Sequence, residues 1–157
     1  MKIVLDANVV VAAFASRGLC ESIVELCLHS HEIVLREKLL DEILRNLRQK
    51  IKLPSGIVKD IGKLLREHAD MVIPVPLARN LCRDPDDVKI LGLAVTASVD
   101  CIVTGDKDLL ILERFQGIPI LTPRSFSNLL HSTEDRIRCI QQITPADLSG
   151  AMPLPGR

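Results

Sequence analysis

Short apolar runs alternate with longer segments of helical periodicity along most of the chain. Runs rich in β-branched residues predict five strands that are largely buried in a sheet. They are KIVL (2–5), EIVL (32–35), MVIPV (71–75), CIVT (101–104) and IPIL (118–121). We expect the third strand to lie near an edge of the sheet, because Pro74 cannot donate a hydrogen bond to a neighbouring strand.

Helices are predicted in the intervals between these strands. In segment 36–51 the apolar residues form one stripe along a helix: Leu40, Ile43, Leu44, Leu47 and Ile51. Further helices are predicted over 18–30, 54–69, 85–99, 107–114 and 122–132. Strands that alternate with helices indicate an α/β domain, in which helices cover both faces of a parallel sheet.

The chain of 157 residues has the length of one domain, which we place at residues 1–131. The remainder, 132–157, is an extension of different character. Its end is rich in residues that disfavour helix and strand: Pro145, Gly150, Pro153, Pro155 and Gly156. We expect a partly flexible extension, and a segment that clasps a partner is the alternative.

The charges balance, with 20 Lys and Arg against 20 Asp and Glu, so the chain as a whole does not attract polyanions. Any contact with nucleic acid must therefore use a local basic patch. Arg45, Arg48 and Lys52 are expected to form one basic ridge on the helix of segment 36–51. An ordinary solvated helix face explains the same residues, since Asp41 can pair with Arg45 at a spacing of four.

The sequence contains no apolar run of the ~20 residues that a membrane span needs, and its start lacks the pattern of a signal peptide. We therefore expect no membrane association and a cytoplasmic location. Five cysteines, an odd number without any C-x-x-C spacing, indicate reduced thiols rather than a disulfide framework or a zinc site.

Acidic residues follow two of the predicted strands directly. Asp6 comes after KIVL, while Asp106 follows CIVT across the turn residue Gly105, with Asp108 two residues further on. If these two strands are neighbours, their ends lie roughly 4.8 Å apart and the carboxylates crowd one crevice. Each acid taken alone could equally be a turn residue or a helix cap.

The segment RDPDDVKILGLAV supplies a third acidic cluster. Pro85 suits the first position of a helix and Asp84 the cap before it. Asp87 also lies in the first turn, but it shares a helix face with Ile90 and Leu91, which must face the sheet. Three separate segments thus bring acids to one sheet edge, and a hard divalent cation with oxygen ligands would relieve their repulsion.

Four motifs together, LDANVVV, LLDEIL, RDPDDVKILGLAV and IVTGDKDLL, resemble the PIN-domain family over residues 1 to about 130. The resemblance is to bacterial, VapC-like toxin components of toxin–antitoxin systems. It implies a three-layer α/β/α sandwich around a parallel sheet of about five strands. It also implies a ribonuclease that depends on Mg²⁺ or Mn²⁺, a homodimer, and a small antitoxin protein as partner.

The resemblance assigns roles to individual residues. It maps the family's acids onto Asp6, Glu42, Asp87 and Asp106, adds Asp84 and Asp108 as auxiliaries, and matches positions that orient the acids to Asn8 and Thr104. We expect Asp6, Asp87 and Asp106, with Asp108, to hold the metal, while Glu42 orients or deprotonates the attacking water. Without the resemblance, Glu42 reads as a solvated residue at the margin of its helix stripe. The helix also begins REK, without the serine cap often found there.

Three alternatives remain open at this point. A phosphoacceptor receiver domain and a haloacid-dehalogenase-type phosphatase also place acids at strand ends around magnesium. The first typically has paired acids after its first strand, and the second needs an aspartate at the position of Asn8. The third alternative is a PIN fold that has lost activity and serves as a binding module.

Overall fold

The computed structural model describes residues 1–141. The described elements are β1 (Lys2–Leu5), α1 (Ala7–Ala15), α2 (Leu19–Ser30), β2 (Glu32–Leu35), α3 (Glu37–Gln49), α4 (Ser55–His68), β3 (Ala69–Met71), the short 3₁₀ helix η1 (Arg79–Leu81), α5 (Pro85–Ala97), β4 (Cys101–Val103), α6 (Lys107–Leu110), β5 (Arg114–Phe115), β6 (Ile118–Leu121) and α7 (Pro123–Gln141). No helix within this range is long and apolar enough to cross a membrane.

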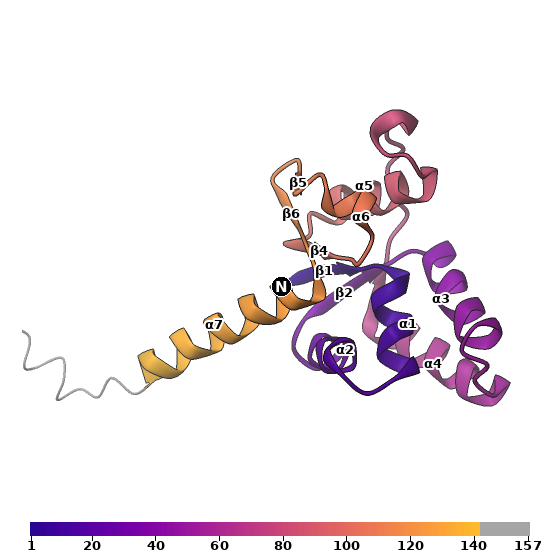
Figure 1. Ribbon diagram of the computed structural model, residues 1–157, viewed down its shortest axis with the longest axis horizontal. Helices are drawn as coiled ribbons and strands as arrows, with labels where there is room; N and C mark the ends of the chain where they lie inside the picture. Colours follow the sequence, from indigo (N-terminus) through magenta and orange to yellow (C-terminus); the bar gives the residue numbers. More distant parts are fainter. Residues whose placement is uncertain (142–157) are drawn as a thin grey trace, which may run out of the picture.

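The strands form one six-stranded sheet in the order β3-β2-β1-β4-β6-β5. All neighbouring pairs are parallel except β5 with β6. The chain moves from β1 outward to β3 and then returns to the other side of β1 to form β4. Helices α1, α2 and α3 cover one face of the sheet and α5 lies over the other (Figure 1), as right-handed crossovers in opposite directions require. The predicted α/β/α fold is therefore confirmed.

The core is centred on β1, β2 and β4. In β1, Ile3, Val4 and Leu5 are fully buried, and α3 contributes Leu40, Ile43 and Leu47 from its apolar stripe. Helix α5 presents Leu91 and Ala94 to the opposite face, and both are also fully buried. Burial on both faces explains why these strands read as continuous apolar runs instead of alternating ones.

The third strand was predicted in the wrong place. β3 spans Ala69–Met71, and the ladder ends where the Val72 amide donates to the Leu35 carbonyl at 2.8 Å. The chain then leaves the sheet and passes over α5, where the Val75 amide donates to the Thr96 hydroxyl at 2.8 Å. Of the residues expected to form this strand, Met71 ends β3, and 72–75 lie in a loop that is anchored on a helix.

Two further boundaries differ from the sequence predictions. The short helix expected to reach residue 114 ends at Leu110, and Arg114 begins an additional strand, β5. The turn between β5 and β6 consists of Gln116 and Gly117, both with positive φ, as a two-residue type I′ turn requires. Four residues in a helix and two in a strand leave little periodicity for a sequence pattern to reveal.

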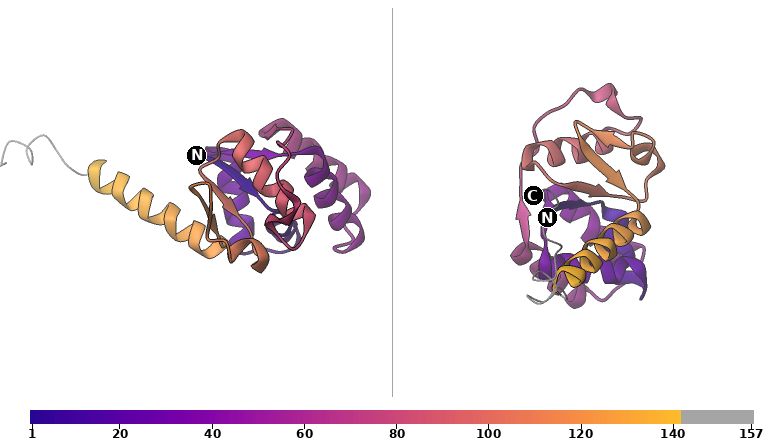
Figure 2. Two further views of the ribbon diagram at one scale, coloured as in Figure 1. Left: turned by 90° about the horizontal axis from the view of Figure 1, so that it is seen from above. Right: turned by 90° about the vertical axis from the view of Figure 1, so that its left-hand side faces the viewer.

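Helix α7 extends away from the layered body of the molecule (Figure 1; Figure 2). It runs to Gln141, so the boundary drawn at residue 132 falls within a continuous helix. The partly flexible extension was expected over 132–157, and 142–157 of it lie outside the described residues. Four cysteines of the described part, Cys20, Cys27, Cys82 and Cys101, are unpaired, as predicted.

Candidate metal centre

The carboxyl ends of β1 and β4 lie side by side at the centre of the sheet. Leu5 pairs with Val103, so Asp6 and Thr104 are the first residues beyond two adjacent strands. This is also the point where the strand order reverses, which in open α/β sheets is the usual position of a binding crevice. The sequence predicted an acidic cluster here if these two strands were neighbours. They are neighbours in the sheet.

Asp6 is held by two hydrogen bonds. Its Oδ1 accepts from the Ala7 amide at 2.8 Å, and its Oδ2 accepts from the Thr104 hydroxyl at 2.7 Å. The Thr104 oxygen in turn accepts from the Asp106 amide at 3.0 Å. The buried threonine therefore connects both strand ends and positions the two aspartates relative to each other. Asp6 is almost fully buried. This burial raises its pKa, although both hydrogen bonds act to lower it.

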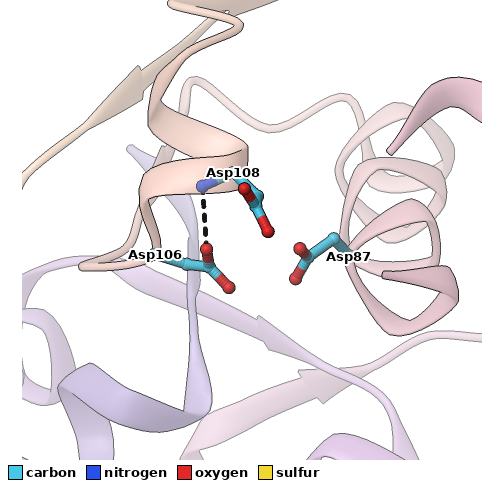
Figure 3. A group of neighbouring side chains, drawn as sticks. All are labelled: Asp87, Asp106 and Asp108. Carbon is cyan, nitrogen blue, oxygen red and sulfur yellow. Dashed lines mark hydrogen bonds between the residues drawn. The ribbon is translucent and has the colours of Figure 1, made fainter. Parts of the chain in front are cut away.

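Asp106 and Asp108 lie at the start of the short helix α6. Asp106 caps the helix, because its Oδ1 accepts from the Asp108 amide at 2.9 Å. Asp108 points back toward the same space, where Asp87 approaches from the opposite side (Figure 3). Asp87, Asp106 and Asp108 each offer an oxygen within 4.8 Å of those of the other two. Three carboxylates from two elements thus converge on one point.

Asp87 is the most deeply placed of these three acids. It lies in the first turn of α5, two residues after Pro85, on the face that packs toward the sheet. Its side chain is 6% exposed, and its Oδ2 is buried without any hydrogen-bond partner in the described part of the chain. Burial, followed by the charges of Asp106, Asp84 and Asp6, raises the pKa of Asp87 to about 7.

Glu42 reaches the same pocket from α3. The pocket measures about 90 Å³, and Asp6, Asp87, Asp106 and Glu42 all line it. Burial raises the pKa of Glu42, and the charges of Asp6 and Asp86 raise it further. Glu42 therefore belongs to the acidic pocket, which its marginal position on the helix stripe did not reveal.

Asn8 and Asp84 lie at the rim of the pocket. Asn8, in the first turn of α1, is exposed and lines the pocket. Asp84 caps α5 by accepting from the Asp86 amide at 2.9 Å and lines the pocket too. Its capping role, proposed from the sequence, is confirmed.

The predicted basic ridge is not a single helix face. Lys52 lies beyond the end of α3, in a left-handed conformation with φ of 60°. Arg48 lines a different groove between α3 and α4, together with Lys59 and Lys63. Arg45 is exposed and close enough to Glu42 for its charge to lower the pKa of that residue. The prediction of one ridge was wrong, because the helix stops at Gln49.

The sequence reasoning missed Arg36 at this site. Arg36 directly follows β2 and lines the acidic pocket beside Glu42. The signal was present, since the rule that identified Asp6, a polar residue at the carboxyl end of a buried strand, also selects Arg36.

The donor set suits a hard divalent cation. All converging atoms are carboxylate oxygens, which Mg²⁺ and Mn²⁺ prefer, and neither a histidine nor a cysteine joins the cluster of described residues. A buried carboxylate oxygen without a partner is costly unless a cation or a proton neutralises it. The residues present therefore fit a bound divalent metal ion.

The chain is an α/β/α domain with an all-carboxylate cluster at the switch point of its sheet, an arrangement typical of α/β domains that bind a cation. Comparison with protein families resolves the class further. The sequence model of the PIN domain matches residues 2–108, and the chain belongs to the PIN-domain family. The matched segment contains every acid of the cluster. The receiver and phosphatase alternatives do not hold for a member of this family. A comparison with curated proteins found no match.

Proposed function

We propose that the protein is a metal-dependent endoribonuclease. Membership of the PIN-domain family supports nuclease activity in general. The observation that carries the proposal is the Asp87 Oδ2 atom, which is buried without a partner and faces the carboxylates of Asp106 and Asp108. A scaffold role does not explain why a buried acid whose charged form is destabilised stands there, whereas a bound cation would stabilise that charged form.

Asp87, Asp106 and Asp108, with Asp6, would hold Mg²⁺ or Mn²⁺. When bound, the metal supplies positive charge next to the phosphate oxygens and lowers the pKa of a water molecule at the site, so that this water can attack at neutral pH. Thr104 keeps Asp6 in place through its 2.7 Å hydrogen bond, so that this carboxylate needs no rearrangement when substrate arrives. The rigidity comes from two strand ends that pair in register.

Glu42 is the candidate general base. Its pKa is raised by burial and by neighbouring acids, which makes its carboxylate a better proton acceptor near neutral pH. The Glu42 carboxylate would take the proton of the attacking water, and the exposed amide of Asn8 would orient a phosphate oxygen at the rim of the pocket.

The biological setting proposed is that of a toxin in a toxin–antitoxin pair. It rests on the resemblance of the four motifs to bacterial PIN-domain toxins and includes a homodimer, a small antitoxin protein as partner and a cytoplasmic location. Expression of the full chain in bacterial cells should arrest growth, and the variant Asp106→Asn should not. Equal growth with both chains would contradict the toxin role but would not contradict the proposed nuclease activity.

Cleavage by the purified chain tests the nuclease directly. End-labelled RNA should be cut internally with Mn²⁺, remain intact with a chelator, and be cut again when metal is restored. Asp106→Asn is the inactive control, purified in parallel to exclude contaminating nucleases. Cleavage of DNA but not RNA would show that the substrate class is wrong. Metal binding with no cleavage of either would favour the binding module.

A further inference from the structure

Arg36 occupies the junction of three hollows on the surface. Its side chain lines the acidic pocket and also two neighbouring grooves. The larger of these grooves, about 540 Å³, runs between the loop 73–77 on one wall and the start of α5, including Val88, on the other. A bound ligand strand that runs from the acidic pocket into this groove must pass Arg36.

The guanidinium of Arg36 has no partner among the described residues. Within the part of the chain that the structure describes, its Nε is buried without a hydrogen bond and the side chain forms no ion pair, although acids surround the pocket that it lines. The adjacent Glu37 bonds to Arg66 instead, at 2.6 and 2.9 Å. A guanidinium carries five donors in a planar fork, and in Arg36 the Nε–H is buried and unbonded, which is costly, while the side chain as a whole is only half-buried. The arrangement indicates an anion that comes from outside the chain.

Phosphate is the anion that matches both the fork and the position. Arginine binds phosphate in a bidentate manner, with two parallel hydrogen bonds. Arg36 lies close enough to the catalytic candidates for its charge to lower the pKa of Glu42. A phosphate at Arg36 would therefore be a near neighbour of one in the acidic pocket.

The adjoining groove is suited to the rest of a nucleic-acid strand. One wall is apolar, formed by the loop 73–77, in which Ile73 is 90% exposed. Lys89 lines the same groove and places a second cationic side chain there, although its Nζ also lies 3.6 Å from Asp86. The loop is fixed in place, because Val75 bonds to Thr96 and a Cβ at Gly92 would lie 2.6 Å from the Val75 carbonyl oxygen. The groove is thus preformed.

We propose that Arg36 binds a phosphate next to the scissile one and directs a single strand of RNA from the acidic pocket into the groove beneath loop 73–77. This inference rests on the proposed function, since it requires a nucleic acid in the acidic pocket. Arg36 is a substrate-binding residue in this account, so its loss should weaken substrate binding more than it slows the chemical step.

Binding to RNA gives the first test. Anisotropy of a labelled single-stranded RNA is measured with Mn²⁺ across a salt series, using full chains that carry Glu42→Gln, which removes the proposed general base to prevent cleavage and leaves the proposed metal ligands intact. Arg36→Gln should weaken binding about tenfold, and the salt slope should fall by about 0.7, the contribution of one phosphate contact to a single strand. Arg36→Lys should recover part of the affinity. Arg17→Gln, which removes an exposed arginine at the far end of α1, is the control and should match its parent.

Steady-state kinetics and a substitution in the groove give two further tests. In the chain with all acids intact, Arg36→Gln should raise KM about tenfold with kcat changed less than about threefold. The Mn²⁺-induced rise in melting temperature should persist, because losing a nearby cation does not weaken cation binding. Ile73→Asp should weaken RNA binding by placing a negative charge in the groove, whereas Ile57→Asp, at an exposed position of α4, should not.

The outcomes separate this inference from the proposed function. If the unmodified chain binds and cleaves RNA while Arg36→Gln behaves like Arg17→Gln, Arg36 does not contact the strand and the inference is overturned. Loss of kcat with unchanged KM in both Arg36 variants would also overturn it. If the unmodified chain neither binds nor cleaves RNA, the proposed function falls first and the inference falls with it.

Discussion

Replacing Asp87 by asparagine separates a metal site from a helix cap. The substitution keeps the size of the side chain and removes a negative charge that is 6% exposed and lies among other acids. If the negative charge of Asp87 mainly stabilises the first turn of α5, removing this charge should destabilise the protein by about 0.3–1 kcal/mol. If Asp87 belongs to a crowded anionic site, the metal-free protein should become more stable.

The pKa of Asp87 determines the size and sign of the effect. In the folded chain it is raised from 3.8 to about 7, so the folded state keeps this proton while the unfolded state releases it. Stability therefore falls as the pH rises from about 4 to about 7, and the full cost remains above that. Roughly three units at about 1.4 kcal/mol each set a ceiling near 4 kcal/mol. Because neighbouring acids share the repulsion and water reaches the pocket, we expect a gain of about 1–3 kcal/mol at pH 8.

Urea unfolding with a chelator present measures this gain. Midpoints of both chains are compared at pH 8 and at pH 4.5, where Asp87 of the folded chain already carries a proton. Most of the gain should be absent at the lower pH. Asp86→Asn is the matched control, since Asp86 occupies the same helical turn but is exposed and pairs with Lys89 at 3.6 Å. It should be slightly less stable than the unmodified chain at pH 8.

One outcome would show that Asp87 carries no unfavourable charge. If Asp87→Asn lost as much stability as Asp86→Asn at pH 8, with no difference between the two pH values, Asp87 would carry no unfavourable charge. The argument for a cation at this position would then lose its main physical basis.

Three other perturbations test neighbouring parts of the account. At about a hundredfold excess over its dissociation constant, Mn²⁺ should stabilise the chain by about 2.7 kcal/mol, and calorimetric unfolding should show no such gain for Asp106→Asn. Thr104→Val should cost about 1–3 kcal/mol in urea unfolding, because the Asp6 Oδ2 loses its donor, whereas Thr104→Ser should retain most of the stability. Gly92→Ala should cost about 1–3 kcal/mol through the close contact with the carbonyl of loop 73–77, whereas Gly56→Ala, which meets nothing within 4 Å, should be close to neutral.

Several features of the fold could be predicted from the chain because local pattern and burial coincide. β1 and α5 are buried on the faces that their apolar residues indicated, and the acid of α5 that shares this face, Asp87, is buried with them. Adjacency of β1 and β4 was only a condition in the sequence argument, because strand order depends on long-range pairing that no local pattern records.

The errors have equally specific causes. β3 is an edge strand of three residues, so its end depends on the hydrogen bond from Val72 to Leu35 and not on its own apolar run. Lys52 was predicted to lie on the helix because the helical spacing continues beyond Gln49, where α3 ends. Glu42 and Arg36 reach the pocket only because α3 begins beside the carboxyl ends of the central strands, which is a tertiary relation.

The most direct test of the metal centre is an anomalous difference map at the manganese absorption edge, from crystals of the full chain grown with Mn²⁺. The account predicts a peak between Asp87, Asp106 and Asp108, with the Asp87 Oδ2 among its ligands. It also predicts no such peak in crystals of Asp106→Asn grown in the same way. No anomalous density between these carboxylates, or manganese bound only elsewhere, would contradict the proposed metal centre.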